Sequence, residues 1–209
     1  MVRTPGFHPG NRGSIPLGTT LSMKTPIEVS ARHLHLSPAD LSKLFGADYQ
    51  LKILKRLSQK QEFAAKETVT LLGDQGTIKS VRIVGPLRPK TQVEISLTDA
   101  KTLGLNPPLR ISGDLRGAGT IKLIGPVGQV TVKAVIVAQR HLHLNPTEAK
   151  KLKLKSGQII KVAIAGERKL ILDNIVVRVA NNFKLMLHLD TDEANASDLR
   201  GPKNYGQII

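Results

Sequence analysis

The feature that most constrains the fold is a pentapeptide that occurs twice. Arg-His-Leu-His-Leu occupies residues 32–36 and again residues 140–144, and the two copies contain four of the six histidines. A β-like stretch precedes each copy, TPIEVSA at 25–31 and VKAVIVAQ at 132–139. A helix-start signal follows each copy. This agreement in strand, histidine pair and helix start indicates an internal duplication.

The two helix signals, SPADLSKLFG and NPTEAKKLKLKSG, agree position by position. Each has an N-cap residue, a proline at the first helical position, an acidic residue at the third and a glycine stop, which are Ser37, Pro38, Asp40 and Gly46 in the first copy and Asn145, Pro146, Glu148 and Gly157 in the second. We therefore expect a short capped helix after each histidine pair.

Most of the remaining chain consists of short stretches rich in Val, Ile, Leu and Thr, separated by Gly, Asp or Pro. They are ETVTLLG, TIKSVRIVG, QVEISL, LRISGD, TIKLIG, QVTVKAVIVA, QIIKVAIAG, LILDNIVVRVA and FKLMLHLD. This pattern predicts a mainly β fold of barrels with a few short helices. Because the chain is duplicated, we expect two barrels related by pseudo-twofold symmetry. Residues 51–67 combine helical charge pairs with a strand-like pattern, so both interpretations stay open there.

The composition limits both chemistry and partners. The chain has no cysteine, which excludes disulfides, thiolate metal ligands and a cysteine nucleophile, and which fits a cytosolic protein. Lys and Arg total 31 against 16 acidic residues, a formal charge of +15. That excess favours nucleic acid, an anionic membrane or a phosphorylated ligand as partner, and solvated surface charge explains it equally well.

Two of these partner classes have little further support. Four Phe, two Tyr and no Trp leave few side chains for base stacking, and no nucleic-acid-binding signature occurs, so we do not expect a nucleic-acid partner. No apolar run approaches the roughly 18 residues of a membrane span. Residues 1–24 lack a continuous apolar core and the spacing of an amphipathic helix, and we interpret them as a loose arm without a secretory signal.

The histidine pairs have the spacing of metal ligands. In a strand, residues i and i+2 point to the same face, so His33 and His35 present two imidazoles together, as do His141 and His143. A catalytic zinc site has three protein ligands and one open position, of which each pair supplies two. Without cysteine, imidazole and carboxylate groups must supply every ligand, which suits zinc with an exchangeable position.

Third ligands must come from elsewhere in the chain. His188 lies in an apolar strand and is the favoured ligand for one pair, while His8 lies in the loose arm and receives no role. For the other pair, Glu94 in TQVEISL is the best-placed carboxylate. An acidic cluster near the C-terminus offers alternative ligands or caps the last helical turn, and consists of Asp190, Asp192 and Glu193.

Five blocks of the sequence, taken in order and spacing, resemble the phosphate propanoyltransferase family of propanediol utilisation, a family of phosphotransacylases. The blocks are VSARHLHLS, VRIVGPLRPKTQVEISLTDA, LRISGD, QRHLHLNPTEA and LHLDTDEANA, and the resemblance runs from about residue 25 to residue 200. It implies two intertwined β-barrels, two zinc ions per chain, and the reaction of acyl-CoA and phosphate to acyl phosphate and coenzyme A. The implied domains are residues 32–138 and residues 25–31 plus 139–209, with a strand exchanged between them.

The resemblance also implies roles for single residues. One zinc ion would be held by His33, His35 and Glu94, and the other by His141, His143 and His188. Arg88, in GPLRPKTQ, matches the arginine that binds phosphate. Three further positions match polar residues that line the family's site and would contact the substrates, namely Gln92, Ser112 and Arg178.

These matches lead to an expected physiological setting. The substrates would be propanoyl-CoA or acetyl-CoA, phosphate and acyl phosphate, with functional coupling to an acyl kinase. Relatives in bacterial microcompartments often carry an amphipathic N-terminal helix, which residues 1–24 do not resemble, so we expect a cytoplasmic enzyme. A homo-oligomer is compatible with the sequence, which does not fix the oligomeric state.

Two other functions use the same residues differently. A zinc-dependent acyl-CoA hydrolase would have the same metal ligands, but Arg88 would then have no evident purpose. A basic β-barrel module that binds nucleic acid would have purely structural histidines and little bound zinc. Metal content and the dependence of acyl-CoA consumption on phosphate distinguish the three functions.

Overall fold

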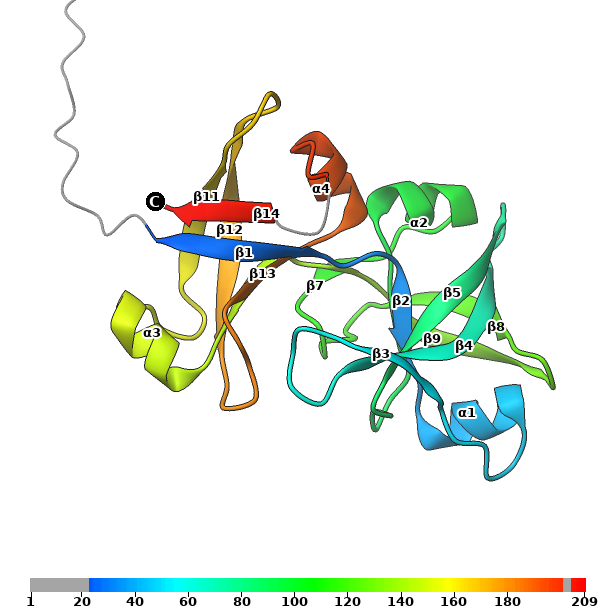
Figure 1. The fold of residues 1–209 in the computed structure, drawn as a ribbon. Helices are drawn as coiled ribbons and strands as arrows, with labels where there is room; N and C mark the ends of the chain where they lie inside the picture. The colour runs from blue at the N-terminus through cyan, green and yellow to red at the C-terminus, as the bar shows by residue number, and fades with distance from the viewer. Residues whose placement is uncertain (1–22, 201–203) are drawn as a thin grey trace, which may run out of the picture.

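The computed structural model describes residues 23–200 and 204–209, which form two β-barrels side by side (Figure 1). His8 and nearly all of the predicted loose arm lie outside the described residues. The mainly β fold with two barrels and four short helices is confirmed. Within the described chain, no helix has the length and apolar character that a bilayer crossing requires.

The first barrel closes through six strands, because β8 pairs with both β9 and β4. The order around it is β4 (Phe63–Leu72), β5 (Thr77–Gly85), β2 (His33–His35), β6 (Gln92–Glu94), β9 (Gln129–Ala138) and β8 (Gly119–Ile124). Two short strands extend it at the edges, β3 (Ile53–Arg56) on β4 and β7 (Leu109–Arg110) on β9. The segment 51–67 that the sequence left open is thus a hairpin made of β3 and the start of β4.

The second barrel is also closed and has six strands. Their order is β1 (Lys24–Val29), β13 (Met186–Leu189), β10 (His141–Leu144), β12 (Leu170–Val179), β11 (Ile159–Ile164) and β14 (Asn204–Ile208). Strand β1 begins at Lys24, which is the last residue of the predicted arm.

Each barrel contains a strand whose continuation lies in the other barrel. Strand β1 pairs with β13 in the second barrel, whereas β2, which follows it in the chain, lies in the first. Strand β9 pairs with β6 in the first barrel, whereas β10 lies in the second. From these pairings we propose residues 32–138 and residues 25–31 plus 139–209 as the two domains.

Four short helices lie at the barrel ends, α1 (Pro38–Phe45), α2 (Leu97–Leu103), α3 (Pro146–Leu152) and α4 (Thr191–Ala196) (Figure 1). Ser37 and Asn145 cap α1 and α3 as predicted, and Gly46 ends α1. The prediction that Gly157 ends α3 is wrong. Lys153 ends it instead by adopting a left-handed conformation at φ 56°, which lets its N–H bond the last turn.

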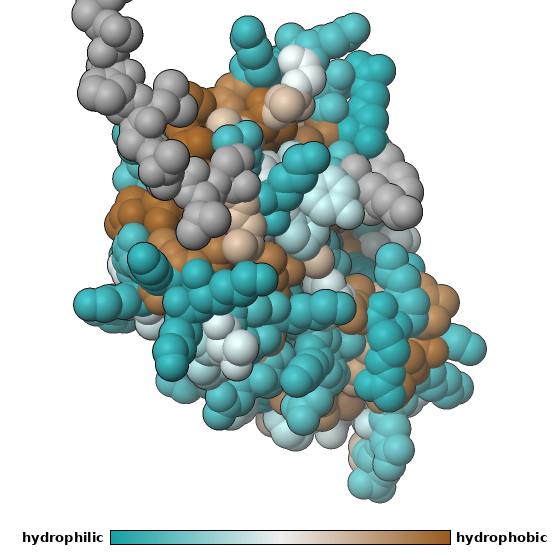
Figure 2. All heavy atoms as spheres, turned by 60° about the vertical axis from the view of Figure 1, so that its left-hand side comes forward, coloured by the Kyte–Doolittle hydropathy of each residue, from teal (hydrophilic) through white to brown (hydrophobic). Residues whose placement is uncertain are grey.

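The leucines of the two pentapeptides anchor the two cores. Leu34 and Leu36 are fully buried in the first hydrophobic cluster, and Leu142 and Leu144 are fully buried in the second. Burial of each leucine contributes about 1.5–3 kcal/mol. Since alternate strand residues point to opposite faces, this burial directs the intervening histidines away from the cores. On the face seen in Figure 2, hydrophilic side chains cover much of the surface and hydrophobic side chains gather between them.

Candidate active site

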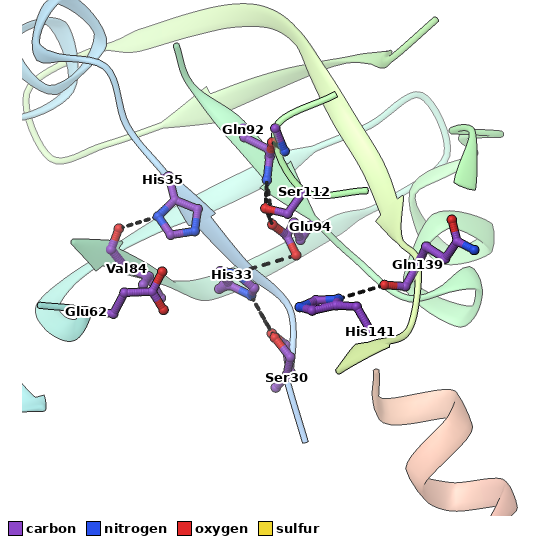
Figure 3. Close-up of polar contacts among 12 residues, drawn as sticks. Ser30, His33, His35, Glu62, Val84, Gln92, Glu94, Ser112, Gln139 and His141 are labelled. Carbon is purple, nitrogen blue, oxygen red and sulfur yellow. Dashed lines mark hydrogen bonds and ion pairs between the residues drawn. The ribbon is translucent and has the colours of Figure 1, made fainter. Parts of the chain in front are cut away.

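The structure brings together the two triads that the sequence proposed as metal ligands. His33, His35 and Glu94 form the first triad, and their candidate ligand atoms lie within 4.8 Å of one another. The second triad meets the same limit and consists of His141, His143 and His188. The site residues of the first triad are seen together with His141 in Figure 3. Residues far apart in sequence therefore meet at two compact clusters.

Strand register explains how each third residue reaches its histidine pair. In the antiparallel pair β2–β6, His33 lies opposite Glu94. In the pair β10–β13, His141 lies opposite His188. Side chains of directly opposed residues share one face of the sheet, so each third residue is placed beside its pair.

The duplication extends further than the pentapeptide, and it relates Glu94 to His188. The two histidine strands also pair in parallel with β5 and β12, where His33 lies opposite Arg82 and His141 opposite Val176. Residues 82–94 and 176–188 then correspond without a gap, which makes Glu94 and His188 equivalent. Only one of these thirteen residue pairs is identical, Lys90 with Lys184, so the equivalence is visible in the strand register and not in the sequence.

Both triads line one cleft of about 300 Å³. Arg88, Ser112 and Arg178, three of the predicted site residues, also line it. Gln92 does not: it is buried behind Glu94, donates a hydrogen bond to Ser112 Oγ at 2.9 Å, and accepts one from the Gly113 N–H. Gln92 is thus placed to orient the carboxylate, while its predicted contact with substrate stays a prediction.

Backbone carbonyls fix the orientation of three histidine rings. The Nδ1 atom lies 2.9 Å from the Ala31 carbonyl oxygen in His33, 2.9 Å from that of Val84 in His35, and 2.8 Å from that of Gln139 in His141. A carbonyl oxygen only accepts, so each Nδ1 donates and each Nε2 keeps a free lone pair. This is the arrangement that metal-ligating histidines have in proteins.

Burial favours the uncharged form of four imidazoles, those of His35, His141, His143 and His188. Desolvation is the main cause that lowers the pKa of His35 and of His188 to about 3, and it also lowers the pKa values of His141 and His143. Neutral imidazole is the form that binds a metal ion. Both ring nitrogens of His143 are buried without a hydrogen-bond partner among the described residues, which costs about 1–3 kcal/mol unless another group satisfies them.

Glu94 is held as a carboxylate. Burial acts to raise its pKa, but His33, His35 and the hydrogen bond from Ser112 outweigh it and bring the pKa to about 2. Its Oε1 atom accepts from Ser112 Oγ at 2.8 Å, and its Oε2 atom lies 3.8 Å from His33 Nε2. An acceptor nitrogen thus faces an acceptor oxygen across the triad. A cation placed between His33 Nε2 and Glu94 Oε2 would satisfy both acceptors. A cation at the second triad would likewise satisfy a ring nitrogen of His143 that has no hydrogen-bond partner among the described residues.

Arg88 lies in the loop between β5 and β6 and lines the cleft together with the first triad. Its backbone N–H bonds the Leu36 carbonyl at 3.0 Å, and its Nη1 atom donates to Ser112 Oγ at 3.2 Å. Ser112 in turn donates to Glu94, so one hydroxyl links the arginine to the triad carboxylate. A guanidinium positioned in this way can bind two oxygens of an anion at once.

Arg178 lies beside the second triad, because it is opposite His143 in the β10–β12 pair. Its guanidinium carbon is 5.4 Å from the centre of the Phe183 ring, and that ring stacks on His143 with 3.7 Å between the centroids. In the described chain it has no hydrogen-bond or ion-pair partner, and burial lowers its pKa. A partly buried cation without an ion-pair partner among the described residues is a candidate position for a second negatively charged group.

Sequence reasoning missed three residues at the site: Phe183 and Glu62 line the cleft, and Gln59 lies beside it with its Nε2 atom 3.4 Å from His188 Nε2. Phe183 covers His143, Glu62 lies 3.5 Å from Arg88 Nη2, and Gln59 exchanges two hydrogen bonds with the Lys184 backbone at 3.1 and 3.2 Å. Burial is the main cause that raises the pKa of Glu62, and the Arg88 charge opposes it. Glu62 and Gln59 belong to the turn between β3 and β4, in a segment whose secondary structure the sequence left open.

The C-terminal acidic cluster serves helix α4 rather than either triad. Asp190 is the N-cap and forms a capping box with Glu193. Asp192 accepts a hydrogen bond from the Thr98 N–H at 2.9 Å, which joins α4 to α2, and Glu193 pairs with Arg140 at 2.8 Å. Of the two interpretations of this cluster, the structure supports the capping one.

Comparisons with known proteins agree with this geometry. The family model described as phosphate propanoyltransferase matches residues 26–200. Curated proteins named phosphate propanoyltransferase include one from Thermotoga maritima, 50% identical over 185 residues that cover 88% of this chain and 86% of the relative. Another from Clostridioides difficile is 47% identical over 81% of this chain and 82% of its own. The chain therefore belongs to the phosphate propanoyltransferase family and is an acyltransferase.

Proposed function

We propose that this enzyme interconverts a short-chain acyl-CoA and phosphate with acyl phosphate and coenzyme A, at a site that holds two zinc ions. The observation that carries the proposal is that two three-ligand clusters and Arg88 line one cleft. The curated relatives are named for phosphate and a propanoyl group, which gives the substrate classes.

The two triads are the proposed zinc ligands. Each offers three ligands of imidazole or carboxylate type, which leaves an open coordination position on a tetrahedral ion. When bound, zinc would supply Lewis acidity toward a carbonyl oxygen and favour the thiolate form of coenzyme A. The unsatisfied nitrogens of His143 and the facing acceptors of His33 and Glu94 support occupancy of both clusters.

The chain's own residues would position the reacting groups. Arg88 would hold phosphate through paired hydrogen bonds, with Ser112 fixing the guanidinium and linking it to Glu94. A phosphate oxygen then attacks the thioester carbon, the carbon–sulfur bond breaks, and coenzyme A leaves. Arg178 would neutralise a second negative charge near the other triad. No covalent acyl-enzyme is needed, in keeping with the absence of cysteine.

Three finer points stay proposals. Propanoyl and acetyl groups differ by one methylene, which a pocket distinguishes by about 1–3 kcal/mol, so both are proposed substrates. An acyl kinase would be the partner that consumes the acyl phosphate. A cytoplasmic location is proposed from residues 1–24, of which all but two lie outside the described chain.

The test is the dependence of acyl transfer on phosphate and on Arg88. Purified protein with propanoyl-CoA should form acyl phosphate only when phosphate is present, and R88A should lower kcat/KM by roughly 100-fold. R116A is the matched control, because that side chain is 88% exposed and pairs only with Asp114 among the described residues. Consumption of propanoyl-CoA without phosphate would indicate a hydrolase instead.

A further inference from the structure

A carboxylate stands beside the arginine that we propose as the phosphate ligand. Glu62 lines the cleft, and its Oε1 atom lies 3.5 Å from Arg88 Nη2. In the described chain, no other hydrogen-bond donor reaches this carboxylate. A site for an anion would ordinarily exclude a negative charge at this distance, since like charges repel.

Resting on the proposed function, we propose that Glu62 makes this site selective for a protonated oxyanion. Hydrogen phosphate carries a P–OH group at neutral pH, and that group can donate a hydrogen bond to the Glu62 carboxylate while Arg88 binds the other oxygens. Sulfate has a similar size and shape but no proton, so it would place a charged oxygen against the carboxylate. A binding site whose carboxylate accepts a hydrogen bond from the substrate discriminates against an analogue, such as sulfate, that has no hydrogen to donate.

The turn that carries Glu62 is fastened to both barrels. Its backbone is held by hydrogen bonds from the Leu57 N–H to the Glu62 carbonyl at 3.1 Å and from the Glu62 N–H to the Gln59 carbonyl at 3.3 Å. The Gln59 side chain bonds the Lys184 backbone of the second barrel at both its oxygen and its nitrogen. Next to it, the Ser58 hydroxyl donates to the Glu28 carboxylate on β1. These contacts hold the turn in place, and with it the Glu62 carboxylate beside Arg88.

Glu28 provides a matched control within the same cleft. It also lines the cleft and carries one negative charge, but its hydrogen-bond partner is Ser58 rather than Arg88. E62Q and E28Q thus remove the same charge from the same cavity at two different positions. If the discrimination against sulfate depended only on the total charge of the cleft, both variants would weaken it. If it depends on the P–OH group, only E62Q should weaken it.

The experiment compares phosphate as substrate with sulfate as competitive inhibitor of phosphate-dependent acyl transfer. In E62Q, the amide can donate to sulfate, so the ratio of the sulfate inhibition constant to the phosphate KM should fall at least tenfold. The same ratio should change less than twofold in E28Q. E62D keeps the charge and should keep the discrimination against sulfate.

Two outcomes would overturn the inference: an unchanged ratio in E62Q, or an equal fall in E28Q. If turnover of E62Q is too slow to measure, calorimetric titration of each variant with phosphate and with sulfate gives the ratio directly. Failure of the proposed function looks different. In that case the unmodified enzyme shows no phosphate-dependent acyl transfer, and R88A changes neither turnover nor phosphate binding.

Discussion

The two triads occupy equivalent strand positions, yet their surroundings differ. In the first, Glu94 takes a hydrogen bond from Ser112, which also receives one from Arg88. In the second, His188 stands at the position of Glu94, and Phe183 stacks on His143. The first triad is connected by hydrogen bonds to Arg88, the proposed phosphate ligand, whereas an aromatic ring stacks on one histidine of the second.

This difference shows what a duplicated scaffold keeps and what it allows to diverge. Register fixes where three side chains meet, so both copies keep a triad. The charge of the triad depends on a single residue: a carboxylate offsets part of a divalent ion's charge, whereas three neutral imidazoles offset none. We therefore expect the first triad to act with the phosphate site and the second to present the more electropositive centre.

The largest expected effects come from removing one ligand of each triad. H35A and H143A should each lower the zinc content from two ions to one per chain and reduce kcat by roughly 100-fold or more. Metal analysis by mass spectrometry and turnover measurements on the same samples check this. H8A is the control, because His8 has no predicted role. Full activity in either variant with one metal-free triad would make that triad structural.

The metal-free protein should lose stability as the pH falls. His35 and His188 have folded-state pKa values near 3, well below the ordinary value of 6.5, so between these values the unfolded chain binds protons that the folded chain does not. The contribution of these two histidines to the free energy of unfolding is therefore fully present above pH 6.5. It declines toward pH 3 by roughly 1.4 kcal/mol per pH unit for each histidine. Urea titrations of the metal-free protein across this range measure the slope.

Comparing single variants sharpens this pH prediction. H188N removes one titrating group of the second triad and should reduce the slope, and H35N should do the same for the first. Equal slopes in the parent and both variants would show that these histidines are not the groups that titrate.

Cutting the link between Arg88 and the first triad should have a smaller effect. S112A removes the hydroxyl that Arg88 and Glu94 share, so we expect kcat/KM to fall about tenfold with both zinc ions retained. S156A is the control, since that hydroxyl bonds only the Val179 N–H among the described residues. Loss of zinc from S112A would show that Ser112 holds the ligand Glu94 rather than the arginine.

The smallest expected effect concerns the aromatic wall of the second triad. F183L removes the ring stacked on His143 and under Arg178, which should lower the stability by about 1 kcal/mol and leave zinc content unchanged. Thermal unfolding of the zinc-loaded enzyme measures this change. A large loss of zinc in F183L would instead make the ring part of what holds the second site together.

Local patterns were sufficient to predict much of this protein. The alternation in the pentapeptide predicted which side chains point together, and the capping residues Ser37 and Asn145 predicted two helix starts. Helix ends were harder, because Lys153 adopts a left-handed conformation that nothing in its residue type requires. The strands before each pentapeptide were predicted too, but their positions in opposite barrels were implied only by the family resemblance.

The sequence by itself determined the duplicated unit, the histidine pairs and the absence of thiol chemistry, since these depend on residue type and on spacing over a few residues. Tertiary structure alone decided that Glu62 faces Arg88, that Phe183 covers His143, and that Gln59 joins the two barrels. Those contacts depend on how two closed sheets sit against each other. Short-range periodicity holds no information about that packing.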